Sequence, residues 1–223
     1  MKKVSILGCG WVGKALADVL AKEHTVNCLS RDMEENEKAK MYDCDVFIIA
    51  IPPRDNYLEV LEESVKQLHA KTQVILLSSI SFYDGKTLVV QAESLVHSLH
   101  NDVVILRLGG LMGYDRIAGK YTAGKVLTSD TRTNYIHRDD VLEIILCVIA
   151  KDLRGEAFKV VAPLQSTKKV LFDQNAEQFG FEKTDFLAGD EEGKVLSPKK
   201  LCERLGYTFL KEDVLEFWQP ALV

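Results

Sequence analysis

The sequence lacks several features that mark particular classes of protein. It has no run of like charges, and its net charge is −5 at pH 7, so it offers no basic surface for nucleic acid or for an anionic membrane. No apolar stretch is long enough to span a bilayer, and glycines interrupt the first one within a few residues, so we expect neither a membrane span nor a signal peptide. The expected partner is therefore a small molecule; the oligomeric state is open.

Paired cysteine motifs are also absent. The five cysteines are scattered, odd in number, and form neither CxxC nor Cys/His spacings. This pattern is typical of reduced thiols and not of a disulfide framework or a zinc site, so we expect a cytoplasmic protein without metal. The motifs GxSxG, HExxH and Walker A are missing too, which leaves hydrolase and nucleotide-triphosphatase activities without support.

What the sequence does contain is a regular alternation of short, β-rich apolar runs with segments of helical periodicity. The runs are apolar on both faces, as parallel strands covered by helices on both sides are, and they begin at residues 4, 25, 46, 73, 103 and 157. The alternation predicts an α/β fold with a doubly wound parallel sheet of the Rossmann type. We expect a dinucleotide-binding domain over 1–150. Residues 151–223 would add the last sheet strand and a small substrate-side cap, with helices near 167–179 and 198–205, continuous with the same domain.

The first strand is followed by GCGWVG at residues 8–13, a GxGxxG pattern that leads directly into the first helical segment. In such a turn the first glycine bends the chain, the second lets the backbone approach a pyrophosphate, and the third lets helix and strand pack closely. The alternative is a glycine turn that serves packing alone. The residues predicted to bind a dinucleotide here are Gly8, Gly10, Trp11, Val12 and Gly13.

The second strand ends where the adenosine ribose is expected to bind. There Ser30 and Arg31 offer a hydroxyl and a guanidinium, which suit a 2′-phosphate and favour NADP. The alternative is that Arg31 is a solvated loop residue and that Asp32 binds the ribose of NAD. After the third strand, Ile51 and Pro52 are predicted to line the cofactor crevice, although a Pro pair there also simply ends a strand.

Four segments in order carry a resemblance to a known family: the turn at 8–13, Ser78-Ser79 after the fourth strand, LRLGGLMG at 106–113 and NYIHRDDV at 134–141. Together they resemble the extended and atypical branches of the short-chain dehydrogenase/reductase superfamily, the NAD(P)-dependent epimerase/dehydratase group. The resemblance covers most of the chain and implies a bound nicotinamide dinucleotide, with Ser78 beside it.

The resemblance also implies roles for a serine and a tyrosine. Ser79 and Tyr83 match the family's SxxxYG pattern, although Asp84 replaces the glycine. By this register Ser79 is the serine that hydrogen-bonds the substrate. Arg107 to Gly113 matches the family's RxxxxxG stretch. His137 reads as a structural residue, and Asp139 or Asp140 as the cap of the helix that follows.

The family's catalytic YxxxK pair is missing. Its positions fall on Gly85 and Val89, and Tyr83 with Lys86 has the spacing YxxK, about 100° off on a helix. Two true YxxxK spacings lie far from the expected strand and are attributed to coincidence: Tyr121/Lys125 and Tyr207/Lys211.

Two functions remain open. The first is an NADP-preferring oxidoreductase or epimerase that acts on a small polar substrate such as a nucleotide sugar, with Ser79 polarising the substrate and Tyr83 or Tyr121 donating the proton. Lys86 would then point to solvent. The second is a non-catalytic, NAD(P)-sensing regulatory protein that has lost its acid/base pair. The superfamily's habit of catalysis favours the first, and the missing YxxxK favours the second.

Overall fold

The computed structural model describes residues 1–29, 40–191 and 193–219. The chain forms two compact units. Unit 1 comprises Met1–Arg107 and Leu142–Phe158, and unit 2 comprises Leu108–Val141 and Lys159–Val223. These units are defined by packing and not by function, so the functional division near residue 150 stays a prediction. Within the described residues, no helix is both long and apolar enough to cross a membrane.

The central sheet has six strands in the order β2-β1-β3-β4-β5-β9, and it confirms the predicted fold class. Strand β1 pairs in parallel with β2 on one side and with β3 on the other. The strand order therefore reverses at β1, where later strands are added on the side opposite β2. Ligands of open α/β sheets bind at such a reversal, outside the carboxyl ends of the strands. The strands are β1 (Lys3–Leu7), β2 (Thr25–Leu29), β3 (Val46–Ile49), β4 (Gln73–Ser79), β5 (Val104–Leu108) and β9 (Ala157–Val160).

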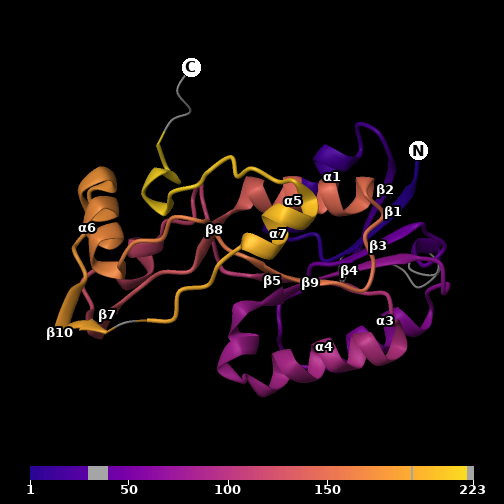
Figure 1. The fold of residues 1–223 in the computed structure, drawn as a ribbon, viewed down its shortest axis with the longest axis horizontal. Helices are drawn as coiled ribbons and strands as arrows, with labels where there is room; N and C mark the ends of the chain where they lie inside the picture. Colours follow the sequence, from indigo (N-terminus) through magenta and orange to yellow (C-terminus); the bar gives the residue numbers. More distant parts are fainter. Residues whose placement is uncertain (30–39, 192, 220–223) are drawn as a thin grey trace. The chain divides into compact units, whose positions relative to one another are not determined.

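Helices cover both faces of this sheet, which explains the continuous apolar runs in its central strands. Figure 1 shows α3 and α4 on one face and α1 and α5 on the other. On β3, Phe47 and Ile49 pack in the cluster formed with α3 and α4, and the intervening Ile48 is fully buried as well. The helices are α1 (Trp11–Leu20), α3 (Tyr57–Lys66), α4 (Thr87–Leu99) and α5 (Arg138–Ala150).

Unit 2 is built from small pieces. It has two parallel pairs of short strands, β6 with β8 and β7 with β10, and a core that includes Leu171, Phe172 and Phe217. Its helices α6 and α7 confirm the two predicted near 167–179 and 198–205, whereas its four strands were not predicted. The elements are β6 (Gly110–Met112), β7 (Val126–Thr131), β8 (Tyr135–His137), α6 (Lys168–Phe179), β10 (Asp185–Glu191) and α7 (Lys199–Leu205).

Candidate functional site

Two glycines of the GxGxxG turn are required by packing. Gly8 has φ +111°, and a Cβ there would lie 2.9 Å from the backbone of Ala50. A Cβ on Gly13 would lie 1.9 Å from the carbonyl oxygen of Gly8, so this residue lets α1 lie against the turn. The Gly8 amide also donates to the carbonyl of Leu29, at 3.1 Å, and thereby ties the turn to the end of β2.

Gly10 differs from both neighbours, because packing does not require it. It has φ −81°, it is the N-cap of α1, and a Cβ placed there would meet no atom within 4 Å. Open space therefore lies directly before the helix N-terminus, where amide groups and the helix dipole attract an anion. The residues present thus fit the pyrophosphate of a dinucleotide, and Trp11 and Val12 form the half-buried start of the helix beside it.

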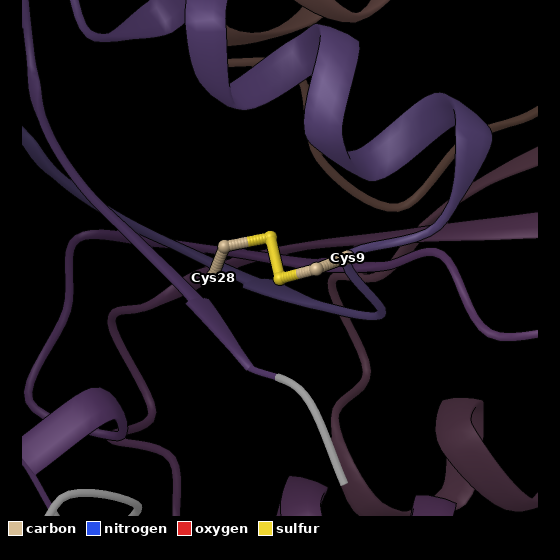
Figure 2. Close-up of a disulfide and its surroundings, with 2 residues drawn as sticks. All are labelled: Cys9 and Cys28. Atoms are coloured by element: carbon tan, nitrogen blue, oxygen red, sulfur yellow. A yellow bond between two sulfur atoms is a disulfide. The ribbon is translucent and has the colours of Figure 1, made fainter. Parts of the chain in front are cut away.

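The turn carries a disulfide, which corrects the expectation that all thiols are reduced. Cys9 lies between Gly8 and Gly10 and is bonded to Cys28 of β2 (Figure 2). The two are 19 residues apart in the sequence, but their Cα atoms are 5.7 Å apart, because β1 and β2 are adjacent strands with Ile6 opposite Cys28. The remaining cysteines, Cys44, Cys147 and Cys202, are free.

The other predicted cofactor residues are placed as follows. Ile51 follows β3, is half-buried and lies against the turn, since its Cγ2 would be 2.9 Å from a Cβ on Gly8. Pro52 is exposed. Ser30 and Arg31 lie outside the described residues.

At the carboxyl end of β4, the structure brings together residues that the sequence keeps far apart. Arg107 of β5 forms an ion pair with Glu93 of α4: its Nη2 lies 2.7 Å from Oε2, and its Nε lies 3.1 Å from both carboxylate oxygens. The same guanidinium donates through Nη1 to the hydroxyl oxygen of Tyr83, at 3.0 Å. Ser78 completes the cluster by donating to Oε1 of Glu93 at 2.5 Å. We call these four residues the Arg107 cluster.

Burial and stacking hold the Arg107 cluster in place. The Glu93 side chain is 4% exposed and that of Arg107 is 15% exposed. The guanidinium lies over the ring of Phe82, with Cζ 3.6 Å from the ring centroid. Burial acts to lower the pKa of Arg107, but its hydrogen bonds with Glu93 and Tyr83 outweigh burial, and the pKa is raised. The cluster thus fixes the Arg107 guanidinium, paired with Glu93, beside the Tyr83 oxygen.

Sequence reasoning missed Glu93, although the sequence contained a signal. Val89, Glu93 and Val96 recur at helical spacing on the buried face of α4. A carboxylate in an apolar helix stripe needs a buried cation or several donors to offset its desolvation. That requirement predicts that Glu93 has a buried partner of opposite charge, but it does not identify Arg107 as the partner.

Ser79 is engaged by its own turn. It is the N-cap of a 3₁₀ helix over Ile80–Asp84, and its Oγ accepts from the amide of Ser81 at 3.2 Å and from the Ser81 hydroxyl at 2.9 Å. A hydroxyl has two acceptor sites and one donor, so Ser79 would meet any further group as a donor.

The alternative tyrosines and lysines lie elsewhere. Lys86 is exposed. In unit 2, Tyr121 is 58% exposed. The Tyr207 hydroxyl donates to Asp140 at 2.7 Å, and Lys211 Nζ donates to the backbone carbonyls of Glu216 and Gln219, so the second YxxxK spacing belongs to a structural contact.

The His137 segment in unit 2 is also structural, but its capping differs from the prediction. The Asp139 amide donates to Nδ1 of His137 at 3.3 Å, so the histidine ring, and not an aspartate, caps the start of α5. Asp139 instead accepts from the Tyr114 hydroxyl at 2.6 Å. Asp140 is fully buried against the segment 210–211. It accepts from the Tyr207 hydroxyl and from the two backbone amides of that segment.

One cavity of about 760 Å³ lies away from these residues, in unit 1. Lys3, Asp45 and Thr72 line it at the amino ends of β1, β3 and β4, next to three charged pairs that include Lys3–Asp43. Parallel sheets bind their ligands at the opposite, carboxyl edge. We therefore assign the site to the glycine turn and the Arg107 cluster and not to this cavity.

Comparisons with known proteins bear on the fold. No family model matches the chain. The Escherichia coli protein YeeZ is 27% identical over 96% of this chain and 98% of its own length.

Among solved structures, a candidate NAD-dependent epimerase/dehydratase from Methylobacillus flagellatus has a TM-score of 0.80 at 20% identity, over 97% of this chain and 96% of its own. The human epimerase family protein SDR39U1 with NADPH has 0.72 at 15% identity, over 96% and 97%. The UDP-glucuronic acid 4-epimerase of Bacillus cereus with NAD has 0.73 at 16% identity, over 97% of each chain. The chain therefore has the fold of the NAD-dependent epimerase/dehydratase and short-chain dehydrogenase/reductase proteins.

Proposed function

We propose that this protein is an NAD(P)-dependent oxidoreductase or epimerase that acts on a small polar substrate such as a nucleotide sugar. The observation that carries the proposal is the open position at Gly10, between two glycines that packing requires and at the start of a helix. Structural neighbours that bind NAD or NADPH, and one that is a UDP-sugar epimerase, support it.

The chain's own groups have defined tasks in this proposal. The nicotinamide, when bound, supplies the chemistry of accepting or donating a hydride. Ser79 donates a hydrogen bond to a substrate oxygen, because its acceptor sites are used by Ser81. Tyr83 transfers a proton to or from that oxygen, while Arg107, 3.0 Å away, keeps the phenol oriented and adjacent to positive charge.

In this scheme Arg107 is a positioning residue that stands in for the missing lysine of YxxxK. A lysine one helical turn from the tyrosine would bring a positive charge to the site from α4. Here the charge comes from β5 instead, and Glu93 holds it there from α4. In this proposal the acid/base function is retained, with Arg107 in place of the family's lysine.

The second candidate is a dinucleotide-sensing regulatory protein. The absence of a YxxxK pair near β4 favours it, and so does the ordered, fully paired state of Glu93 and Arg107, which would suit a purely structural cluster. The two functions share cofactor binding and differ in turnover.

Cofactor binding is tested first. Saturating NADPH at about 100 times its dissociation constant adds about 2.7 kcal/mol of stability, or about 5–10 °C in melting temperature. Gly10→Ala should fold normally, since the new Cβ meets no atom, yet weaken the dinucleotide at least about tenfold by filling the space before α1. Asp18→Ala, at an exposed position of the same helix, is the control. Equal affinity in Gly10→Ala and wild type would overturn the assignment.

We further propose NADP as the preferred form, on the strength of Ser30 and Arg31. Loss of a charge-assisted hydrogen bond to the 2′-phosphate weakens binding about 10- to 100-fold, so Arg31→Ala should lose NADPH affinity and keep that for NADH. Titration of both nucleotides with both proteins distinguishes the outcomes. An equal loss for NADH and NADPH would show that Arg31 does not contact the phosphate.

A further inference from the structure

We propose that Cys9 and Cys28 form a reversible thiol–disulfide site whose oxidation state sets the affinity of the protein for its dinucleotide. The inference rests on the proposed cofactor binding and adds a regulatory site that the proposed reaction does not use.

The position of the bond carries the inference. Cys9 occupies the one residue between Gly8 and Gly10, within the turn that would hold the pyrophosphate. Cys28 is the penultimate residue of β2, the strand whose end would meet the adenosine ribose. The bond therefore ties together two elements that must hold the two halves of one adenosine diphosphate group (Figure 2).

The bond is placed where a reductant can reach it. Cys9 and Cys28 are both half-buried, whereas Cys44 is buried in the core. Burial raises the pKa of the Cys44 thiol to about 11, which keeps it protonated and unreactive at neutral pH. Accessible disulfides are typically the labile, regulatory ones.

The chemistry is a two-step exchange with a small dithiol. One thiolate of the dithiol attacks a sulfur of the Cys9–Cys28 bond, which breaks as a mixed disulfide forms. The second thiol of the dithiol then displaces the remaining protein sulfur. The protein gains two electrons and two protons as two thiols, and the dithiol leaves as its own disulfide. A small disulfide reverses the process.

The structure also indicates the direction of the effect. With the bond present, the turn keeps its Gly8–Leu29 hydrogen bond and the space at Gly10 stays open, so the oxidised turn is already shaped to receive an anion. Reduction removes the covalent tether and leaves Cys9 and Cys28 free to move apart. Binding must then fix the turn again, so the reduced protein should bind the dinucleotide about 2- to 10-fold more weakly.

The experiment combines thiol counting with titration. After treatment with oxidised glutathione, alkylation and mass spectrometry should find three reactive or denaturation-exposed thiols, those of Cys44, Cys147 and Cys202. After dithiothreitol all five should react. NADPH titrations, followed by calorimetry, should show tighter binding to the oxidised form. The variant Cys28→Ser should bind like the reduced form in either condition, and Cys202→Ser, which removes a free thiol, should respond like the wild type.

The outcomes separate this inference from the proposed function. If neither form binds NADPH or NADH, the proposed function fails. If both forms bind with equal affinity, or if five thiols react after oxidation, cofactor binding stands and the thiol–disulfide site is refuted. Tighter binding by the reduced form would also overturn the inference as stated.

Discussion

Tyr83 in unit 1 and Tyr114 in unit 2 form hydrogen bonds of opposite direction through their hydroxyl groups. In unit 1 the Tyr83 oxygen accepts a hydrogen bond from the Arg107 guanidinium. In unit 2 Tyr114 donates to the carboxylate of Asp139, and this hydrogen bond, followed by burial, raises the pKa of Tyr114. A phenol that donates to a carboxylate is held in its protonated form. The Tyr83 oxygen instead meets a cation, so the two phenols differ in the charge of their partner.

The charge of the hydrogen-bond partner, and not the spacing of tyrosine and lysine, distinguishes the candidate proton donor from the other tyrosines. Tyr207, which has a YxxxK spacing with Lys211, donates to Asp140 and belongs with Tyr114. Tyr83, which lacks the spacing, meets a positive charge. Substitutions in each unit can test whether this difference between Tyr83 and the other two tyrosines is functional.

The largest effect is expected from Glu93→Ala. It would leave the Arg107 guanidinium buried without its carboxylate, and breaking a buried ion pair costs about 3–5 kcal/mol. Chemical denaturation should show the loss, and turnover should fall beyond what the folded fraction explains, because Arg107 loses its position beside Tyr83.

The matched change in unit 2 is Asp140→Ala, which removes a buried carboxylate with three donors. It should lower stability without affecting turnover per folded molecule. Equal losses of turnover in Glu93→Ala and Asp140→Ala would show that the Arg107 cluster has no special role in turnover.

The second effect concerns Tyr83 itself. A positioned general acid contributes about 10²- to 10⁴-fold, so Tyr83→Phe should lower kcat at least about 100-fold while NADPH affinity stays unchanged. A panel of UDP-sugars, with product isomers separated by chromatography, supplies the assay. Unchanged kcat in this variant on a substrate that the wild type converts would assign Tyr83 to structure and leave Tyr121 as the candidate donor.

The main strands were predictable from the sequence because burial on both faces leaves a continuous apolar run, as in VFII of β3. The GxGxxG turn was predictable because its backbone geometry leaves no room for a side chain at two of the three glycines. The strands β7 and β10 were not, because Val126 and Leu187 are largely exposed and polar residues interrupt both strands.

The missed parts of the site depend on tertiary neighbours. Cys9 and Cys28 meet because β1 and β2 are paired, which no cysteine spacing reveals. Arg107 meets Glu93 because α4 packs beside β5, and the sequence shows only that Glu93 occupies a buried helical position. Local pattern indicated that Glu93 is buried, but it revealed neither the disulfide nor the partner of Glu93.

A smaller effect is expected from pH at His137. Burial lowers the pKa of this histidine below its ordinary value of 6.5, although Asp139 acts in the opposite sense and Lys211 and Arg138 add to the lowering. The unfolded chain therefore binds a proton at His137 more readily than the folded chain does. The contribution of His137 to stability is fully present above pH 6.5 and is lost as the pH falls through and below that value. Melting temperatures across this range should decline less in His137→Asn, whose amide oxygen can still accept from the Asp139 amide. Parallel profiles in the two proteins would contradict a buried, neutral His137.

The smallest effect is expected from Tyr114→Phe, the counterpart of Tyr83→Phe in unit 2. The lost hydrogen bond to Asp139 is short, at 2.6 Å, but Tyr114 is 53% exposed, so water replaces much of it and the cost in stability should be about 0.5 kcal/mol. The Arg138 guanidinium, 4.2 Å from the ring centroid, keeps its contact with the phenylalanine ring. Turnover should not change, because a phenol held protonated by a carboxylate is a poor proton donor. A 100-fold fall in kcat here, as large as that expected for Tyr83→Phe, would move the chemistry to unit 2 and reverse the comparison.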